Sequence, residues 1–369
     1  MQFNTTLDSI RVYEAGKPIE LVVREYGIPP KSVIKLASNE NPHGSSKKAI
    51  KAIKKASKEA YRYPDDSMFV LKNGLCARFG IMPSNLIIGA GSDQVLEFCV
   101  RAKCKEGSKV LMAKTTFAMY EVYAKQVGAL VFRTPSDQHN LDEFKTIYKK
   151  EGADIIFLCL PNNPLGECLD RKDVYDFLRE VNPETLVVID GAYQEYAAYK
   201  DKKKKIDPTD LIERFPNAIY LGTFSKAYGL GGMRVGYGIA QEEIIGALLK
   251  MRPPFNVSTL SLVGAIESLS DKKHVDFSIR DCFDEMALYE AFAKKHKIEF
   301  IPSYTNFVTL LLDGLASSTE VSQWLLERGV IVRNLASYGM NAIRITIGGE
   351  SQNRRFFKLF AKYLKKTAA

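Results

Sequence analysis

The sequence predicts an α/β protein with a large domain, built on a mainly parallel sheet covered by helices, and a smaller α+β domain. The first observation is an alternation of short apolar runs and helical stretches from about residue 66 to residue 240. Such alternation is typical of parallel sheets covered on both faces. The second is a change to long helices and a few separated strands in the part that follows. With 369 residues, the chain is long enough for two domains.

The part of the chain before this alternation is mixed. Residues 12–18 are expected to form an irregular arm, residues 19–26 a short helix, and residues 46–60 a lysine-rich amphipathic helix. Between them, residues 35–44 are polar and rich in turn formers. This segment is either a surface loop or, because of its amide and carboxyl groups, a wall of a substrate site.

The large domain is expected to contain short buried strands separated by helical stretches. The expected strands cover residues 86–88, 109–113, 129–134, 154–160, 186–190, 218–221 and 234–240. Ligands of parallel sheets bind beyond the carboxyl ends of the strands. Because polar motifs follow several of these strands, we expect the motifs to meet in one site.

The remainder of the chain is expected to form the smaller domain. A long helical region ends near residue 295, and a strand–turn–strand unit covers residues 300–312. Further expected elements are helices over 319–328 and 352–366 and strands over 330–333 and 342–347.

The composition is that of a soluble globular protein, with 46% hydrophobic and 26% charged residues. No secretory signal and no apolar run of membrane-spanning length is visible, so we expect a cytoplasmic protein without a membrane partner. The six cysteines form no C-x-x-C pair and the four histidines are scattered, so no metal site is expected.

The formal net charge is +9, and part of it lies in the run Lys202–Lys205. A nucleic-acid-binding protein can carry such a charge. The run falls in an expected loop without interleaved aromatic residues, so a solvated face is favoured and no nucleic-acid partner is expected. A positive field would also attract an anionic substrate.

The most informative stretch is Thr223–Gly236, which contains hydroxyls, one lysine, a glycine cluster and one arginine after an apolar strand. Hydroxyls and arginine suit a phosphate. Lys226, in such a crowded and partly dry place, would lose proton affinity and become a nucleophile towards carbonyls. Phosphate donors beside an amine suggest pyridoxal 5′-phosphate (PLP), whose aldehyde condenses with lysine. The alternative is a solvated lysine in a glycine-rich loop.

The stretch Gly89–Asp93 follows an expected strand and opens a helix, so its free N–H groups would hold an anion. A dinucleotide fingerprint would need a third glycine where this chain has Gln94, and an acidic residue at the end of the next strand. That strand ends in Lys114 instead, so a single phosphate is favoured.

Two further motifs end expected strands. The turn Pro161–Gly166 contains Asn162 and Asn163, and an asparagine amide there could donate to the phenolate oxygen of a pyridine ring; the alternative is a turn and nothing more. Asp190, at the end of a buried strand, needs a partner to offset desolvation, and a protonated pyridine nitrogen would serve. An N-cap role is the alternative. Tyr193 could reach the phenolate oxygen.

Phe117 could stack on a flat ring, although most aromatic residues in such places belong to the core.

Arg344 lies in an otherwise apolar strand and Arg333 in a similar one. Arginine is rarely buried without a partner, and a substrate carboxylate would suit its planar fork. A structural ion pair is the alternative for both residues.

Taken together, these stretches resemble the fold-type I PLP-dependent aminotransferases over nearly the whole chain, from about Tyr13 to the last helix. The motifs that carry the resemblance are Ser38–Gly44, Tyr61–Asp65, Gly91–Asp93, Asn162–Gly166, Asp190–Tyr193, Ser225–Ala227 with Arg234, and Arg344. This chain also departs from the family pattern. Family members often carry other residues at four positions, which here are Ala90, Gln94, Phe117 and Gly191. Of the four, Phe117 alone would touch the cofactor, and phenylalanine can still stack on it.

The resemblance implies that Lys226 binds PLP covalently, that Asp190 pairs with the ring nitrogen, and that Asn163 and Tyr193 contact the phenolate oxygen. Lys226, Asp190 and Tyr193 would be the catalytic residues. The other implied cofactor-binding residues are Gly91, Ser92, Asp93, Phe117, Thr223, Ser225 and Arg234, with Tyr63 reaching across a dimer interface. The implied substrate-binding residues are Tyr13, Asn39, Arg333 and Arg344.

The implied activity is transamination between L-histidinol phosphate and 2-oxoglutarate, which gives imidazole-acetol phosphate and L-glutamate. A homodimer with shared sites is implied. Residues 1–45 would form an arm and part of the small domain, residues 46–255 the large PLP-binding domain, and residues 256–369 the rest of the small domain. An aromatic aminotransferase, a threonine-phosphate decarboxylase and a regulatory protein on the same fold remain alternatives.

Overall fold

The computed structural model describes residue 1, residues 5–10 and residues 19–367, and within them the large sheet has seven strands. Their order is β2-β8-β7-β6-β5-β3-β4, and every neighbouring pair is parallel except the two that involve β8. The strands are β2 (Leu86–Gly89), β3 (Lys109–Met112), β4 (Leu130–Arg133), β5 (Ile155–Cys159), β6 (Leu186–Asp190), β7 (Ala218–Thr223) and β8 (Gly236–Ala240). The α/β class predicted from the sequence is confirmed.

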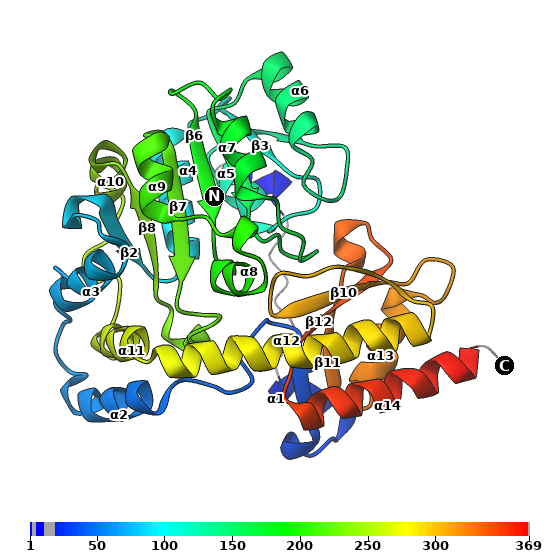
Figure 1. The fold of residues 1–369 in the computed structure, drawn as a ribbon. Helices are drawn as coiled ribbons and strands as arrows, with labels where there is room; N and C mark the ends of the chain where they lie inside the picture. The colour runs from blue at the N-terminus through cyan, green and yellow to red at the C-terminus, as the bar shows by residue number, and fades with distance from the viewer. Residues whose placement is uncertain (2–4, 11–18, 368–369) are drawn as a thin grey trace.

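Helices cover both faces of this sheet (Figure 1). Each strand is apolar on both faces, and its alternate residues pack in two different apolar clusters, one against each layer of helices. Phe157 packs in the cluster of one face and Leu158 in that of the other. The first face is covered by α4 (Ser92–Lys103), α5 (Met119–Gln126) and α10 (Glu242–Leu249). The opposite face is covered by α6 (Leu141–Glu151), α7 (Arg171–Leu178), α8 (Gln194–Lys200) and α9 (Pro208–Arg214).

A second sheet of five strands contains segments from both ends of the chain, in the order β1-β11-β12-β10-β9. Its strands are β1 (Ile34–Leu36), β9 (Glu299–Ile301), β10 (Phe307–Leu311), β11 (Val330–Asn334) and β12 (Ala342–Thr346). The associated helices are α1 (Ile19–Tyr26), α13 (Ser318–Leu326) and α14 (Glu350–Thr367). Strand β1 pairs in parallel with β11, so an amino-terminal segment completes a sheet made of carboxyl-terminal strands.

The two sheets are joined by the longest helix of the described chain, α12 (Lys272–Lys295), which runs from the large domain across the second sheet (Figure 1). Before it, α11 (Thr259–Ser270) packs against α2 (Lys47–Ala56) and α3 (Phe69–Phe79). Because α11 thus lies with helices of the large domain, we propose that the small domain begins within α12 rather than at residue 256. The remaining domain limits stay predictions.

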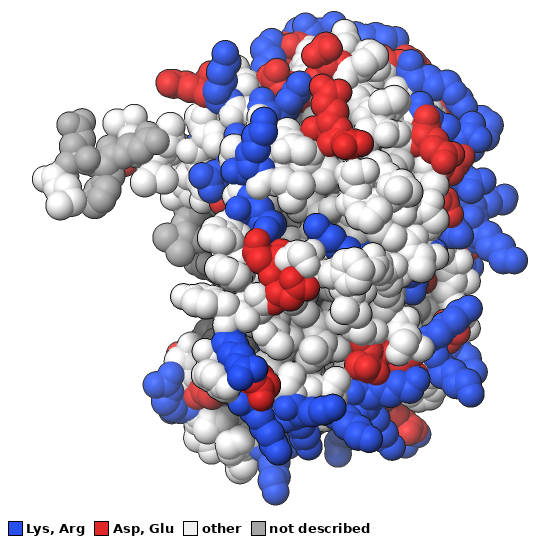
Figure 2. Space-filling model, turned by 90° about the vertical axis from the view of Figure 1, so that its left-hand side faces the viewer, with Lys and Arg blue, Asp and Glu red and all other residues white. Residues whose placement is uncertain are grey.

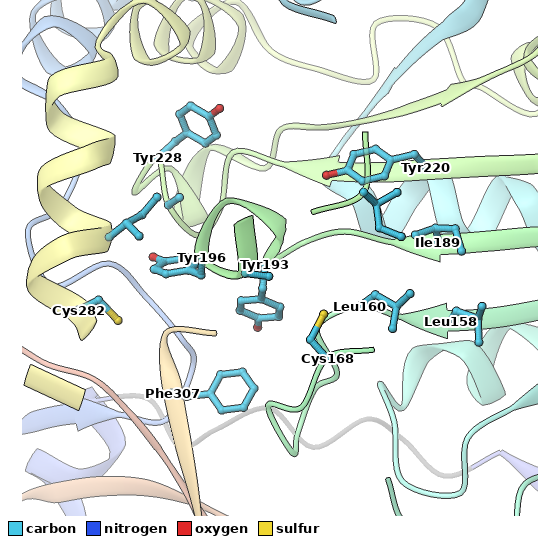
Figure 3. Close-up of a cluster of buried hydrophobic side chains, with 14 of the residues drawn as sticks. Leu158, Leu160, Cys168, Ile189, Tyr193, Tyr196, Tyr220, Tyr228, Cys282 and Phe307 are labelled. Carbon is cyan, nitrogen blue, oxygen red and sulfur yellow. The ribbon is translucent and has the colours of Figure 1, made fainter. Parts of the chain in front are cut away.

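A continuous apolar core fills the space between the two sheets. Figure 3 shows Phe307 of β10 facing Tyr193, which lies at the start of α8, with Cys168 next to them and Leu160 and Leu158 further along the same cluster. The rings of Phe307 and Tyr193 meet edge to face, with 5.5 Å between their centroids. Such aromatic pairs add about 0.5–1.5 kcal/mol beyond area burial. The core therefore fixes the second sheet directly against the carboxyl ends of the first.

Most elements lie within a few residues of the positions predicted from the sequence, but one strand was not predicted and two limits differ. The strand missed is β1, three residues long, in a stretch without clear alternation. The strand expected to end at residue 221 continues to Thr223. The helix expected over 46–60 is α-helical only as far as Ala56, after which a 3-10 turn follows.

Asn353 at the start of α14 provides a test of how the second domain is held together. Its buried side chain accepts from Tyr289 of α12 and from the Gly348 amide, and donates to Glu285 and to the Gly348 carbonyl. Each buried polar group left unsatisfied costs about 1–3 kcal/mol. We therefore expect Asn353→Ala to lower the free energy of unfolding by roughly 2–5 kcal/mol in urea titrations. The exposed Asn73→Ala should leave it nearly unchanged, and equal effects of the two substitutions would contradict this role.

Candidate functional site

Polar side chains gather where the adjacent parallel strands β5, β6 and β7 end. These strands end at Cys159, Asp190 and Thr223, and the motifs singled out in the sequence follow them directly. Residues 37–41, which follow β1, and Arg344 of β12 approach the same edge from the second sheet, as their hydrogen bonds show. The candidate site therefore lies between the two domains.

Asp190 is a buried carboxylate at the end of β6. Its Oδ2 accepts a hydrogen bond of 2.7 Å from the Tyr120 hydroxyl, and its Oδ1 accepts one of 3.1 Å from the Ala192 amide. Burial raises the pKa of Asp190, while the Tyr120 bond opposes the rise. Tyr120 in turn stacks on Phe157 with 4.5 Å between ring centroids. Asp190 is thus a fixed acceptor poised for a cationic partner.

Tyr120 was not predicted from the sequence. It lies in α5, three residues after Phe117, and resembles an ordinary core aromatic residue. Its hydroxyl is fully buried, and buried tyrosine hydroxyls usually find a polar partner. The need for a partner was the one available signal that Tyr120 belongs to the site. It could not show that the partner is Asp190, which is 70 residues away in the chain.

Lys226 lies in the loop after β7, with its side chain half-buried. Its Nζ donates to the Ser38 carbonyl at 3.2 Å and lies 5.8 Å from the centroid of the Tyr193 ring. Burial, together with the positive charges of Arg344 and Arg234, lowers the pKa of Lys226 to about 8. A substantial fraction of this amine is therefore neutral near pH 8, as a nucleophile or base requires.

Asn39 links the two domains at this site. Its Nδ2 donates to the Tyr193 hydroxyl at 2.8 Å, while its backbone N–H donates to Thr346 of β12 at 2.9 Å. Asn39 has φ 58, and its carbonyl accepts from Asn306 at 2.9 Å. A left-handed conformation is uncommon for most residues but is adopted more readily by asparagine, so this set of bonds holds a backbone conformation to which Asn39 is suited. Burial raises the pKa of Tyr193, whose hydroxyl accordingly remains protonated.

Arg344 is buried in β12 and donates to the Asn163 side chain and, at 2.6 Å, to the Ala37 carbonyl. Its guanidinium also lies 5.0 Å from the centroid of the Phe307 ring. Arg333 of β11 is its register partner and is half-buried. The two arginines therefore project from the same face of the second sheet.

A group of phosphate-type donors surrounds the amino terminus of α4. Gly91 is the N-cap with φ 84, and Ser92 is the first helical residue. Arg234 donates to the Ser225 hydroxyl at 3.2 Å, and the Thr223 hydroxyl lies 3.0 Å from that of Ser225. A Cβ on Gly91 would come within 2.5 Å of the Arg234 guanidinium, so only glycine leaves room for this contact.

Three predicted site residues that the structure describes lie apart from these contacts. Asp93 accepts from Tyr123 at 2.9 Å through Oδ2, while its Oδ1 is buried with no hydrogen-bond partner among the described residues. Phe117 is half-buried and meets Tyr120 edge-on. Tyr63 is 83% exposed and stacks on Phe255. Tyr13 lies outside the described residues.

Across the described chain, no cluster of three or more His, Cys, Asp or Glu side chains is arranged to hold a metal ion. In the same residues, no helix is both long and apolar enough to cross a membrane.

Comparison with known proteins defines the class. The family model of the class I and II aminotransferases matches residues 31–358. The chain therefore belongs to the class I and II aminotransferase family and is an aminotransferase.

Within that family, the chain belongs with the histidinol-phosphate aminotransferases. It is 67% identical to histidinol-phosphate aminotransferase of Wolinella succinogenes over 99% of both chains. It is 61% identical to that of Aliarcobacter butzleri, over 99% of this chain and 100% of the other. The fold also matches a crystal structure of histidinol-phosphate aminotransferase from Sinorhizobium meliloti in complex with pyridoxal 5′-phosphate, with a TM-score of 0.90, 24% identity and coverage of 99% and 98% of the two chains.

The arginine next to the lysine gives a titration prediction. Because Arg344 is the charge that most lowers the pKa of Lys226, Arg344→Gln should raise that pKa above about 8, towards the ordinary 10.5. The pH dependence of Lys226 labelling by an amine-directed reagent, followed by peptide mass spectrometry of the cofactor-free protein, measures this shift. Arg328→Gln, which removes an arginine stacked on Trp324, should leave the midpoint in place. An unchanged or lower midpoint in Arg344→Gln would be inconsistent with this electrostatic role.

Proposed function

We propose that the protein is a PLP-dependent transaminase that interconverts L-histidinol phosphate plus 2-oxoglutarate and imidazole-acetol phosphate plus L-glutamate, a step of histidine biosynthesis. The single observation that carries the proposal is the full-length identity of 67% to a histidinol-phosphate aminotransferase. The arrangement of Lys226, Asp190 and the donors around α4 supports it independently.

The residues present fit PLP. The hydroxyls of Thr223 and Ser225, the Arg234 guanidinium and the start of α4 are suited to a phosphate dianion. The buried Asp190 carboxylate is suited to a pyridinium nitrogen. We therefore assign to the phosphate Gly91, Ser92, Thr223, Ser225 and Arg234. We also assign Asp93 to the cofactor site, because it lies in the first turn of α4 and is held there by a hydrogen bond from Tyr123.

The remaining cofactor assignments concern the ring. Phe117 would lie against its face, and Asn163 and Tyr193 would contact the phenolate oxygen. Both already have partners, since Asn163 accepts from Arg344 and Tyr193 accepts from Asn39. Asn163 therefore still has its amide hydrogens to donate, and Tyr193 its hydroxyl hydrogen. PLP, when bound, supplies an electron sink that stabilises negative charge on the substrate Cα.

Lys226 would first bind the cofactor covalently and then, once released, act as the base. With a pKa lowered to about 8, its Nζ can accept the proton from the substrate Cα and later return it. The Ser38 carbonyl, which accepts from Nζ at 3.2 Å, gives the released amine a fixed position. Asp190, held by Tyr120, keeps its orientation throughout.

The substrate would lie between the two domains. Arg344 and Arg333 project from one face of the second sheet and provide positive charge for the carboxylates of glutamate and 2-oxoglutarate or for a substrate phosphate. Asn39 borders the same space through its bond to Tyr193. We assign Tyr13 to the substrate as well, from the family resemblance alone.

A homodimer with shared sites is part of this proposal. Large apolar side chains are exposed on the elements drawn at the left of Figure 1, and Figure 2 views this side. They include Tyr61, Tyr63, Phe69, Val70, Leu249 and Phe255, each at least 40% exposed. The centre of the face in Figure 2 is largely uncharged, with Lys, Arg, Asp and Glu around it. Such a surface favours a protein partner, and we assign Tyr63 to the cofactor phosphate of a second copy.

We also propose a cytoplasmic location. All six cysteines are free, and five of them are buried, a state typical of reducing compartments.

The substrate assignment is tested by steady-state kinetics of the purified protein. We expect kcat/KM for histidinol phosphate with 2-oxoglutarate to exceed that for histidinol or phenylalanine by well over tenfold, because the positive groups of the site interact with the phosphate. The preference should weaken as salt rises. Equal values for histidinol phosphate and phenylalanine would favour an aromatic aminotransferase. Release of CO₂ from O-phosphothreonine without transamination would favour a decarboxylase.

The role of Asp190 is tested by Asp190→Asn, which keeps the size of the side chain but removes the anion. We expect kcat to fall by more than about tenfold, equivalent to ~1.4 kcal/mol of barrier, with a nearly unchanged melting temperature. The control is Asp210→Asn, which breaks a surface ion pair with Arg214. A decrease smaller than about tenfold in Asp190→Asn would count against pairing with the ring nitrogen.

A further inference from the structure

The exposed Tyr63 segment is fastened to the loop after α10. Tyr63 stacks on Phe255 with 4.7 Å between ring centroids. Phe255 has φ 55, a conformation that bulky residues rarely adopt. Its backbone N–H donates to Asp66 Oδ1 at 2.7 Å, so Asp66 holds this unusual backbone in place.

Asp66 is also bound by both terminal nitrogens of Arg252, at 2.8 and 2.7 Å. This bidentate ion pair fixes geometry as well as charge. The Arg252 side chain is only 16% exposed. Arg252 and the Phe255 amide lower the pKa of Asp66 to about 2, so the pair stays charged at any pH at which the enzyme would work.

The hydrogen bonds continue from this ion pair to the proposed phosphate loop. Arg252 Nη1 also donates to Asn256 Oδ1 at 3.0 Å, and Asn256 Nδ2 donates to Gln94 Oε1 at 2.7 Å. The same Gln94 oxygen accepts from the Ala90 backbone N–H at 2.7 Å. Ala90 immediately precedes Gly91, the N-cap of α4. An unbroken chain of polar contacts thus runs from the exposed aromatic pair to the proposed phosphate loop.

We propose that Asp66, Arg252, Asn256 and Gln94 form a positioning network that serves two cofactor sites at once. At one end it holds the phosphate loop of its own subunit, and at the other it holds Tyr63 for the second copy. This inference rests on the proposed PLP site and dimer. None of the four residues is assigned a contact with PLP; they act through Ala90 and Tyr63.

A connected network predicts a different outcome from four residues that each stabilise only their own surroundings. A change at its centre should affect both sites, whereas a change at either end should affect one. Hybrid dimers distinguish the two sites when one subunit carries Lys226→Ala, because only the other subunit can then bind PLP covalently. The readout is the PLP dissociation constant, measured from borohydride-reducible cofactor at the intact Lys226.

Asp66→Asn is introduced into either subunit of the hybrid. We expect the dissociation constant to rise about five- to tenfold in both placements, equivalent to roughly 1–1.4 kcal/mol. Gln94→Ala should act only when it is in the subunit with Lys226 intact, and Tyr63→Phe only when it is in the other subunit. An effect of Asp66→Asn confined to one placement, or absent from both, overturns the proposal.

A second measurement and a substitute variant keep the result independent of folding and of the proposed function. Amide hydrogen exchange in the full-length protein without cofactor should be faster at residues 88–94 in Asp66→Asn than in the wild type, and unchanged exchange overturns the inference. If Asp66→Asn does not fold, Arg252→Lys, which keeps the charge but loses the planar fork, replaces it in both experiments. Asp176→Asn, which removes a surface partner of Lys172 and Arg179, is the matched control. Failure of the wild type to bind PLP would reject the proposed function, while the exchange experiment would still test the network.

Discussion

The contact of Arg344 with Asn163 and with the Ala37 carbonyl is the interaction on which the geometry of the site depends. A buried guanidinium must find acceptors, since a charge left without partners in the interior is very costly. The acceptors here come from the loop after β5 and from the segment after β1. One side chain of the second sheet therefore ties together three segments that are distant in sequence. It adds to the bonds by which Asn39 holds residues 37–41 and by which Asn162 holds the loop after β5, and it connects these two segments to each other.

The charge of Arg344 adds to the effect of burial on the lysine. Burial alone disfavours the ammonium form, and the nearby positive charges of Arg344 and Arg234 disfavour it further, so that the pKa of Lys226 is lowered to about 8. Burial also disfavours the charged form of Asp190, but for a carboxyl group this raises the pKa. The Tyr120 hydroxyl partly offsets that cost through a hydrogen bond to the charged form. Burial in the same site therefore acts on both groups. It makes Lys226 lose its proton more readily, and it makes a cationic partner favourable for the Asp190 carboxylate.

The sequence predicted those parts of the site that follow from local pattern. Buried strands are visible as apolar runs, and polar motifs at their ends marked Asp190, Asn163 and Lys226 as neighbours. Contacts that depend on packing between distant segments were not predictable. The Tyr120–Asp190 and Asn39–Tyr193 bonds join residues 70 and 154 positions apart. The strand β1 was missed because three residues show no usable periodicity, and its partner β11 is supplied by the other end of the chain.

The single reversed strand of the large sheet explains how an arginine reaches the phosphate donors. The other strands end at the edge where the site lies, but β8 begins there, because Gly236 is the register partner of both Thr223 in β7 and Gly89 in β2. Arg234, two residues before this strand, is thereby delivered between the loop after β7 and the start of α4. A Cβ on Gly236 would lie 2.0 Å from the Ser92 amide nitrogen, so glycine is required for this approach. Strand direction and the absence of one Cβ together place a cation where the other six strands of the sheet present only their carboxyl ends.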